Sequence, residues 1–559
     1  MSVRHAWLLS MTCALAACGG GGGGGGNDSA DVTPPIELDP PVVVPLGEEA
    51  AARFLTQATF GPTPTEIREL AVDDSYEQWL AEQAAHPVSL QLAYLDAMPL
   101  DTILWQGSHI EAWWEHAVRG PDQLRQRAAF ALSQILVVSD NSPLEGQERM
   151  LAAYYDILSA NALGNYRELL EQVTLSHAMG MYLSMFQNQK PSNAAGVRAD
   201  ENYAREIMQL FTVGLEELNP DGTPRLDGDG QTIPTYTQAD IENLARVFTG
   251  WSWGGGTQSE HFWWYSAADL TGPMSAYAAF HDTGAKTLLG GAQIPAGLTP
   301  QQDLERALDI LFAHPNLGPF LGRQLIQRLV TSNPSPAYVQ RVATAFDDNG
   351  AGERGDLYAV IRAILLDPEA RQGHLSSPQN FGKLREPLLR LTHLWRVFDG
   401  TGLLGNFPYW NPTRELGQAP LRSPSVFNFF RPDHKPAGLL ADAGLVAPEF
   451  QITTENTLAT TGNVLAYSVN SYLDSLGGNV DTLWPYAIYL DLRSWETLAP
   501  TPATLVDELD LVFMSGQMPS AMRTALVSYL GQIPANTGSE RLREALLAVV
   551  LSPQQAIQR

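Results

Sequence analysis

The chain has 559 residues, a formal net charge of −27 and two cysteines. A chain this acidic is not a general nucleic-acid binder, because the phosphate backbone would repel it. Cys13 and Cys18 both lie near the N-terminus, so the rest of the chain has no disulfide and no thiolate for catalysis or metal ligation.

Residues 1–17 have the composition of a lipoprotein signal peptide. Arg4 precedes an apolar run that ends in Leu15-Ala16-Ala17-Cys18. The run is too short to span a bilayer, and its small residues suit a processing peptidase. We therefore expect cleavage before Cys18 and lipidation of this cysteine, with palmitate as one acyl chain. The alternative is an ordinary secretory signal with an incidental cysteine.

The residue after Cys18 bears on sorting. It is Gly19, whereas the bacterial lipoproteins that this N-terminus resembles typically carry an aspartate there when they stay at the inner membrane. The resemblance implies an outer-membrane lipoprotein that faces the periplasm or the cell surface. Residues 18–47 continue with eight glycines and a proline-rich stretch, a composition that predicts a flexible and then extended tether.

Helical periodicity dominates from residue 48 onward. We predict a mainly α fold, a large multi-helical single unit with long ordered coil segments and at most a small β-hairpin. The predicted helices cover residues 49–58, 64–83, 121–138, 146–160, 164–176, 200–213, 237–248, 301–313, 316–330, 336–347, 355–366 and 381–398.

Two regions depart from this pattern. The turn Asn219-Pro220-Asp221-Gly222 has short flanks that suit a small hairpin. Residues 400–500 are rich in proline, glycine, asparagine and aromatic residues, and we expect them to wrap the helices as ordered coil. The body then covers residues 48–500, and residues 501–559 return to helices as a C-terminal cap.

Eight ordered stretches together resemble one family over nearly all of residues 48–558. They read ARFLTQATFGPTPTEI, ENYAREIMQLFTVGLEELNPDGT, YTQADIENLARVFTGWSW, FHDTGAKTLLG, GPFLGRQLIQRLVTSNPSP, RGDLYAVIRAILLDPEAR, GKLREPLLRLTHLWR and LGQAPLRSPSVFNFFRPDH. The chain is similar to the bacterial domain of unknown function family 1800.

This resemblance implies little about activity. The family has no established activity, and its members are exported and often encoded beside the family of unknown function 1501, which resembles sulfatases. Many members carry a histidine-rich stretch where this chain has residues 126–134, which contain no histidine. The resemblance therefore does not imply a histidine metal site here.

The stretch 199–214 raises the first candidate residues. On a helical wheel, Glu201 and Arg205 lie opposite the apolar arc, four residues apart, and predict a modest surface pair. Glu206 lies at the margin of that arc with Asn202 one turn earlier, where partial burial would raise the carboxyl pKa and prepare a general acid or base. The alternative is a structural carboxylate. The apolar arc itself is formed by Tyr203, Ile207, Leu210 and Phe211.

A second group gathers around a glycine turn in FHDTGAKT. His281 suits a general base or a metal ligand, Asp282 adjoins it, and Lys286 suits anion binding. A single His-Asp pair lacks the second spaced ligand of a metal motif, so we assign no metal and no cofactor. The alternative is a capping or turn role.

Eight aromatic residues lie between Trp251 and Phe280. Exposed indoles there suit stacking on a sugar, whereas buried ones fill a core under a long loop. The candidate binding residues are Trp251, Trp253, Trp263 and Trp264.

Three functions follow from these observations. The first is an accessory or binding role in envelope or glycan processing, with a glycan ligand and a sulfatase-like partner of family 1501. The second is a hydrolase that uses Glu206 with His281 or Asp282, oriented by Asn202 and Arg205, and it requires these side chains to converge in one pocket. The third is a structural scaffold.

Overall fold

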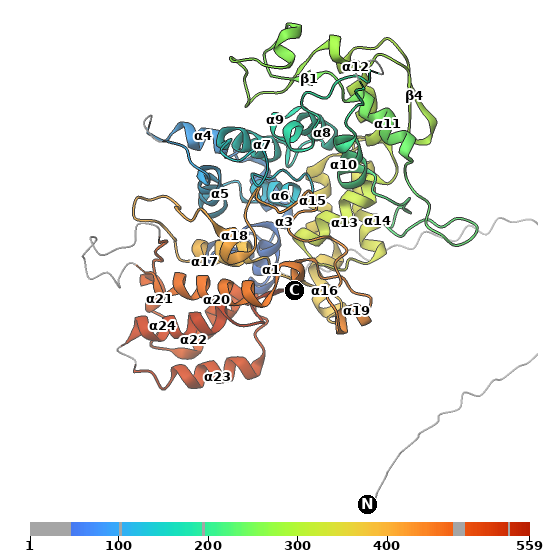
Figure 1. The fold of residues 1–559 in the computed structure, drawn as a ribbon. Helices are drawn as coiled ribbons and strands as arrows, with labels where there is room; N and C mark the ends of the chain where they lie inside the picture. The colour runs from blue at the N-terminus through green and yellow to red at the C-terminus, as the bar shows by residue number, and fades with distance from the viewer. Residues whose placement is uncertain (1–45, 100–102, 193–195, 473–486, 535–536) are drawn as a thin grey trace, which may run out of the picture. The chain divides into compact units, whose positions relative to one another are not determined.

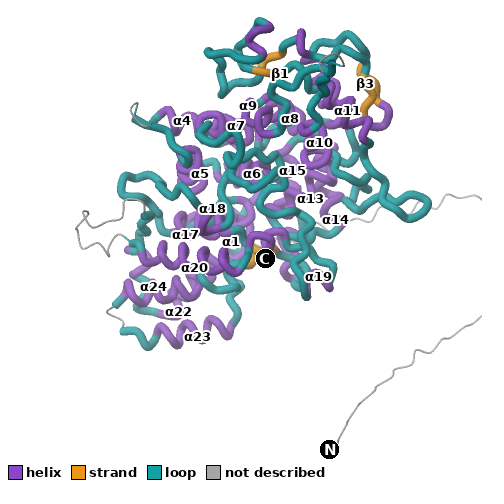
Figure 2. The backbone as a smooth tube through the Cα atoms, viewed as in Figure 1, coloured by secondary structure: helices purple, strands orange, loops and turns teal. Residues whose placement is uncertain are grey.

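The computed structural model describes residues 46–99, 103–192, 196–472, 487–534 and 537–559. Cys18, the signal sequence and most of the predicted tether lie outside these residues. Residues Pro45–Arg559 form one compact unit. It is mainly helical, as predicted, with small two-stranded sheets (Figures 1 and 2). Within the described ranges, no helix is both long and apolar enough to cross a membrane.

The first part of the unit is a set of helices around a common core. The buried helix α6 packs against α7, and α7 packs in turn against α8. The predicted helix 64–83 is two helices, because Asp74 adopts a left-handed conformation and Ser75 caps the next helix. The helices are α1 (Glu48–Ala58), α2 (Pro64–Asp73), α3 (Tyr76–Ala85), α4 (Gln91–Asp96), α5 (Ser108–Arg119), α6 (Gln123–Ser133), α7 (Glu148–Asn161), α8 (Tyr166–Leu175) and α9 (His177–Tyr182).

The predicted helix 200–213 changes type along its length. Its first part is α10 (Asn202–Glu206), and its second part is the π-helix η1 (Ile207–Thr212). The hydroxyl of Thr212 donates to the carbonyl oxygen of Ile207 at 2.6 Å. A π-helix widens each turn, yet Tyr203, Ile207 and Phe211 of the predicted apolar arc are buried as expected. Leu210, predicted in the core, is only partly buried.

The next segment carries most of the strands. Residues 215–235 form a small excursion held by isolated bridges around the predicted turn, and α11 (Gln238–Val247) begins with a capping box from Thr237 and Asp240. The short elements that come after α11 pair as β1–β2 and β3–β4, both antiparallel. They are β1 (Trp251–Ser252), η2 (Ser259–Phe262), β2 (Ser275–Ala276), η3 (Ala278–Phe280), β3 (Lys286–Leu288), η4 (Leu289–Gly291) and β4 (Ala292–Ile294).

The chain continues into a compact helical group, in which α13 packs against α14 and α6. The predicted helix 381–398 begins later than expected, at Pro387, because Lys383 and Leu384 form a strand with the C-terminal residues Ile557 and Gln558. The elements are α12 (Pro300–Ala313), α13 (Leu317–Leu329), α14 (Pro336–Asp347), α15 (Leu357–Leu366), α16 (Pro368–Ser376), β5 (Lys383–Leu384) and α17 (Pro387–Val397).

Residues 400–500 are less irregular than predicted. They contain α20 (Glu455–Asn470), whose threonines, asparagines and glycine are weak helix formers, and which is stabilised by a Thr454 capping box and by packing on α18 and α24. The C-terminal helices α22 and α24 pack together, and α22 contacts α1. The remaining elements are α18 (Pro412–Leu416), α19 (Leu439–Asp442), η5 (Pro448–Ile452), α21 (Arg493–Glu496), α22 (Pro502–Met514), α23 (Ser520–Leu530), α24 (Gly538–Val550) and β6 (Ile557–Gln558).

Candidate functional site

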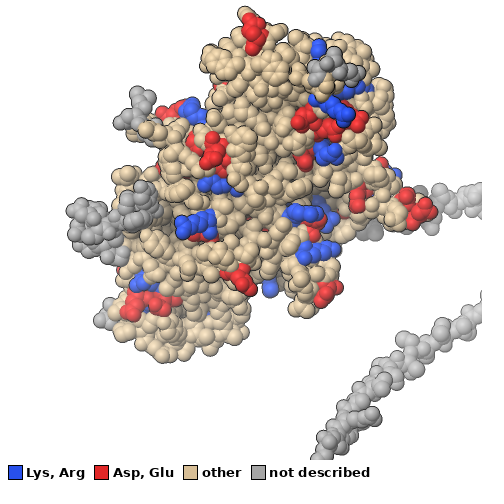
Figure 3. Space-filling view, viewed as in Figure 1, with Lys and Arg blue, Asp and Glu red and all other residues tan. Residues whose placement is uncertain are grey.

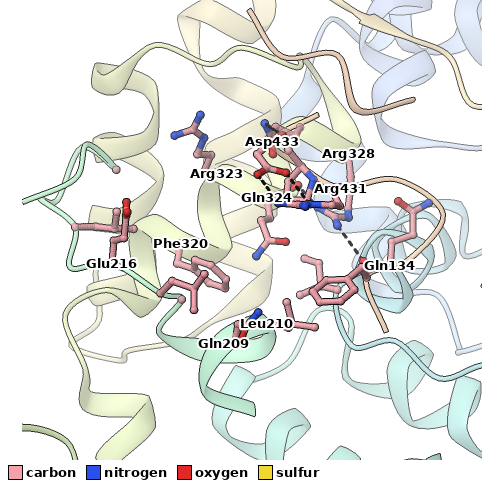
Figure 4. A pocket seen from close by; sticks show the side chains of 18 of the residues that line it. Gln134, Gln209, Leu210, Glu216, Phe320, Arg323, Gln324, Arg328, Arg431 and Asp433 are labelled. Atoms are coloured by element: carbon pink, nitrogen blue, oxygen red, sulfur yellow. Dashed lines mark hydrogen bonds and ion pairs between the residues drawn. The ribbon is translucent and has the colours of Figure 1, made fainter. Parts of the chain in front are cut away.

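A cavity of about 470 Å³ opens beside α13 (Figure 4). Four separate segments line it: residues 134–135 directly after α6, the π-helix η1 with residues 214–224, one face of α13, and the loop 426–433. Three of the family-like stretches therefore meet here: 201–223, 318–336 and 416–434.

The face that α13 turns to the cavity follows from helical spacing. Phe320, Arg323, Gln324, Gln327 and Arg328 lie three or four residues apart and line the cavity together. In Figure 4 the carboxamide of Gln324 points into the space next to the Phe320 ring. Apolar side chains complete the walls, among them Ile135, Leu210, Leu218, Val426, Phe427 and Phe430.

Four buried side chains in this lining keep polar atoms without a hydrogen-bond partner among the described residues. Gln324 Nε2 and Arg328 Nε are free donors, and Gln134 Oε1 and Gln327 Oε1 are free acceptors. Each of these side chains is at most 9% exposed. Because a buried polar atom without a partner costs about 1–3 kcal/mol, such a group of atoms indicates a place for a ligand or for water.

The guanidinium of Arg328 is the charged centre of the site. Its Nη1 and Nη2 donate to the carbonyl oxygens of Gln324 and Gln134 at 3.0 and 2.9 Å. In the described ranges no carboxylate forms an ion pair with it. Burial lowers the pKa of Arg328 to about 10, so this side chain stays charged at neutral pH.

Further buried charged side chains lie next to Arg328, and the cations among them outnumber the carboxylates. Arg127 Nη2 and Lys383 Nζ donate to the Arg328 carbonyl oxygen at 2.7 and 2.8 Å. Lys383 also pairs with Glu449 at 2.9 Å and lies 3.7 Å from Glu386. The three cations Arg127, Arg328 and Lys383 thus meet two carboxylates, which leaves one positive charge in excess. Burying such a charge is costly unless an anion compensates it.

Positive charges are also in excess among the residues that line the cavity. Arg323, Arg328 and Arg431 face Glu216 and Asp433, so three cations meet two acids in a chain of net charge −27. Arg431 pairs with Asp433 at 2.8 Å, whereas Arg323 forms no ion pair with any described residue. Figure 3 shows basic side chains gathered over α13 and near α19 on the viewed face.

The candidate residues of 199–214 lie outside this cavity. Glu201 and Arg205 form the predicted surface pair at 3.5 Å. Glu206 is 7% exposed, its Oε2 has no partner among the described residues, and burial raises its pKa, an effect that Arg205 partly offsets. Asn202 was expected beside Glu206 on one stripe but is exposed, and its backbone N–H donates to Asp200.

The histidine motif forms its own buried cluster. His281 Nδ1 lies 2.9 Å from the carbonyl oxygen of Thr249, and His281 Nε2 lies 3.1 Å from Asp303 Oδ2. Lys286 donates to the same Asp303 carboxylate and to the carbonyl oxygen of Asp282. His281, Lys286 and Asp303 are each 1% exposed, so these side chains reach one another and not solvent.

Asp282 belongs to the edge of this cluster. Burial opposes its ionisation, but two hydrogen bonds from Arg246, at 2.8 and 3.1 Å, help to hold the Asp282 pKa below its ordinary value. Within the described part of the chain, no hydrogen bond or ion pair joins Glu206 to His281 or Asp282. None of these three residues lines the cavity beside α13.

The aromatic segment 251–280 divides into two parts. Trp251 is 2% exposed, and Trp253 packs edge-on against Phe186 with ring centroids 4.8 Å apart. Trp263 and Trp264 are 51% and 68% exposed. Trp251 and Trp253 therefore pack in the interior, and of these four indoles only Trp263 and Trp264 are accessible to a ligand.

Among the residues that line the cavity, Gln134 and the polar residues of α13 were not singled out from the sequence. Gln134 lies in the stretch noted only for its missing histidines, and Arg328 lies within QLIQRLV, in which polar and apolar residues are mixed. The signal that could have found them is a long polar side chain on an otherwise apolar helical face, because such a residue must bury its polar atoms.

Among the described residues, no group of three histidine, cysteine, aspartate or glutamate side chains is placed to hold a metal ion. A family model described as "Protein of unknown function (DUF1800)" matches residues 53–556. No curated protein and no solved structure matches the chain.

Proposed function

The chain belongs to the DUF1800 family of proteins of unknown function, and we propose that it is a binding protein in envelope or glycan processing whose cavity beside α13 holds an anionic ligand with an apolar body. The observation that carries this proposal is the excess positive charge at Arg328, next to four buried polar atoms that lack partners.

The cavity suits this class of ligand in two ways. A carboxylate, sulfate or phosphate oxygen can accept from Arg328 Nε and Gln324 Nε2, which have no acceptor among the described residues. Such a charge-assisted bond is roughly twice as strong as a neutral one. The rings of Phe320 and Phe430 offer contact area to the apolar part of the ligand.

A hydrolase site has less support. It required Glu206, His281 and Asp282 in one pocket, whereas His281 is occupied by Thr249 and Asp303 in the interior. Asp282 accepts two hydrogen bonds from the Arg246 guanidinium. A scaffold role needs no cavity with free polar atoms, and the lining of the α13 cavity argues against it.

We also propose that the protein is located at the outer membrane. A lipidated Cys18 would tether the binding body to the outer membrane, where the sulfatase-like proteins of family 1501 are candidate partners. Mass spectrometry of the mature N-terminus tests the tether, and an unmodified Cys18 would contradict it. Co-purification from solubilised envelopes tests the partner, and the absence of any sulfatase-like protein in the eluate would contradict that part.

Ligand binding is tested with residues 19–559, which lack both the signal peptide and Cys18, so that no detergent is needed. Anilinonaphthalenesulfonate, which joins an apolar body to an anion, is titrated by fluorescence and then displaced by phenylpropanoate or by its neutral counterpart phenylpropanol. We expect the carboxylate to displace the dye at about tenfold lower concentration than the alcohol, a difference of about 1.4 kcal/mol. Equal displacement by both would overturn the anion assignment.

A further inference from the structure

The loop 423–433 also borders a second cavity, of about 620 Å³. Pro424 and Phe429 of this loop line it, whereas Phe427 and Phe430 line the cavity beside α13. The two cavities share no lining residue, so the inference about the second cavity does not rest on the function proposed for the first.

Two tryptophans in contact, Trp105 and Trp410, form what we call the tryptophan platform of this second cavity. Trp410 lines it and is 40% exposed. Trp105, 41% exposed, meets Trp410 edge-on with ring centroids 5.5 Å apart. Two exposed indoles in contact are unusual on a surface unless they contact a ligand, because each keeps a large apolar area in water.

The surrounding backbone holds this platform in place. Gly107 has a positive φ of 124°, and a Cβ on it would lie 2.9 Å from the Cβ of Trp410. Only glycine therefore allows this close approach. Arg422 Nη1 donates to the carbonyl oxygen of Trp410 at 3.4 Å, which helps to fix the segment that carries the indole.

The floor of the cavity is a buried ion pair. Arg422 Nε donates to both oxygens of Asp140, at 3.0 and 2.8 Å, and the two side chains are 9% and 0% exposed. Gln106 Nε2 lies 3.5 Å from Asp140 Oδ2. The pair is neutral as a unit, so it offers oriented polar groups without attracting a net charge.

The rest of the lining is uncharged or balanced. Arg414 and Arg422 are matched in number by Asp140 and Glu145, so the net charge is zero, in contrast to the cavity beside α13. The hydroxyl of Thr413 is buried and has no hydrogen-bond partner among the described residues. The amides of Gln106, Asn141 and Asn411 also line the cavity.

We propose that this second cavity binds an uncharged sugar unit of a glycan. The Trp410 ring would stack on the apolar face of the sugar ring, and the Thr413 hydroxyl with the neighbouring amides would bind its hydroxyl groups. A sugar fits this lining because amide and hydroxyl groups both donate and accept, as sugar hydroxyls do. Neither a charged head group nor a purely apolar ligand would use both features.

The test is a binding screen of the full chain against neutral gluco-, manno-, galacto- and N-acetylglucosamine oligosaccharides, followed by titration of the best ligand. We expect Trp410→Ala to weaken its binding about tenfold or more, as for an aromatic side chain at the centre of a contact. Trp410→Phe, which keeps a ring, should restore part of the affinity. Thr413→Val, which keeps the shape and removes the hydroxyl, should weaken binding about fivefold, or about 1 kcal/mol.

Trp264→Ala, which removes an exposed tryptophan from the segment 251–280, tests the alternative sugar site. The control is Tyr467→Ala, which removes an exposed aromatic ring that lines neither cavity and should leave sugar binding unchanged. Loss of binding in Trp264→Ala with retention in Trp410→Ala would move the sugar site to that segment and overturn the proposal. Failure of every oligosaccharide to bind would also overturn it. Gln324→Leu should leave sugar binding unchanged, and Trp410→Ala should leave dye binding unchanged. The proposals for the two cavities are therefore tested separately.

Discussion

Two buried polar clusters in this molecule differ in whether their cations form ion pairs with carboxylates. Around His281, each cation has an acid: Lys286 pairs with Asp303, and Arg246 pairs with Asp282. Beside α13, Arg328 donates only to backbone carbonyl oxygens. His281, Lys286 and Asp303 of the first cluster are closed to solvent, while the second cluster lines a cavity of about 470 Å³.

This difference in charge pairing distinguishes a structural cluster from a binding site. It is a difference in ion pairs and not in every atom, because Asp303 Oδ1 in the first cluster also has no hydrogen-bond partner among the described residues. Buried polar groups that satisfy one another stabilise a fold, and buried groups left without partners reduce its stability. Proteins keep the second kind chiefly where function needs it. The motif with the most recognisable catalytic residues, FHDTGAKT, is thus the structural one, and the unremarkable glutamines and arginine of α13 form the candidate site.

The largest effect should come from breaking the closed cluster. Asp303→Ala leaves Lys286 buried without a carboxylate within ion-pair distance other than Asp282 at 3.7 Å, and we expect a loss of about 3–5 kcal/mol in the free energy of unfolding. Denaturant unfolding measures it. Asp309→Ala, which removes an exposed carboxylate paired with Arg167, is the control and should cost less than about 1 kcal/mol. Equal costs would mean that the cluster does not stabilise the fold.

Two buried glutamines give a closer comparison. Gln123 Nε2 donates to the carbonyl oxygens of Gly120 and Ala117 at 2.8 and 3.2 Å, whereas Gln324 Nε2 has no partner among the described residues. Gln123→Leu should cost about 1–3 kcal/mol of unfolding free energy because it leaves those groups unpaired. Gln324→Leu should be neutral or stabilising and should weaken dye binding about tenfold, or about 1.4 kcal/mol. A large stability loss in Gln324→Leu would make its amide structural.

A smaller effect is expected at the rim of the cavity. Arg323→Gln removes an exposed cation that has no ion pair with any described residue, and it should weaken binding of the anionic dye about twofold to fivefold. The loss should shrink as salt is added, because salt screens an exposed charge. Arg306→Gln on α12 removes an exposed arginine outside the cavity and should leave the affinity unchanged. If both variants weaken binding equally, net charge and not the cavity attracts the dye.

The smallest effect concerns Glu206, which resembles the open site in having an unpartnered oxygen. Burial raises its pKa above the ordinary value of 4.5, so the folded state favours the neutral form. The resulting stability is fully present at low pH and is lost as pH rises through the folded pKa. Glu206→Gln should therefore raise the melting temperature at pH 7 and leave it unchanged near pH 4. A decrease at pH 7 would show that the carboxylate has a stabilising partner.

Much of the architecture followed from sequence pattern. The mainly α fold and the helices 49–58, 301–313 and 336–347 are confirmed within about one residue, because apolar spacing and capping residues there agree. The helix α20 was missed because its polar composition gives little sign of the tertiary packing that stabilises it. The π-helix at Ile207 was missed because the α-helical period was applied to the whole of residues 200–213.

Sequence pattern could have indicated single buried polar residues such as Arg328, but it could not predict which segments meet to form the cavity. Gln134, Gln324 and Arg431 come from three segments far apart in the chain, and no local spacing predicts that they meet. Local spacing did predict the Glu201–Arg205 pair, since both residues lie on one helix. The free polar atoms at Gln324 and Arg328 become visible only when every neighbour is placed.

The most direct measurement is a crystal structure of the full chain with phenylpropanoate. The account predicts the carboxylate within hydrogen-bond distance of Arg328 Nε or Gln324 Nε2, with the phenyl ring against Phe320. A ligand bound elsewhere, or an empty cavity at a concentration that displaces the dye, would contradict it.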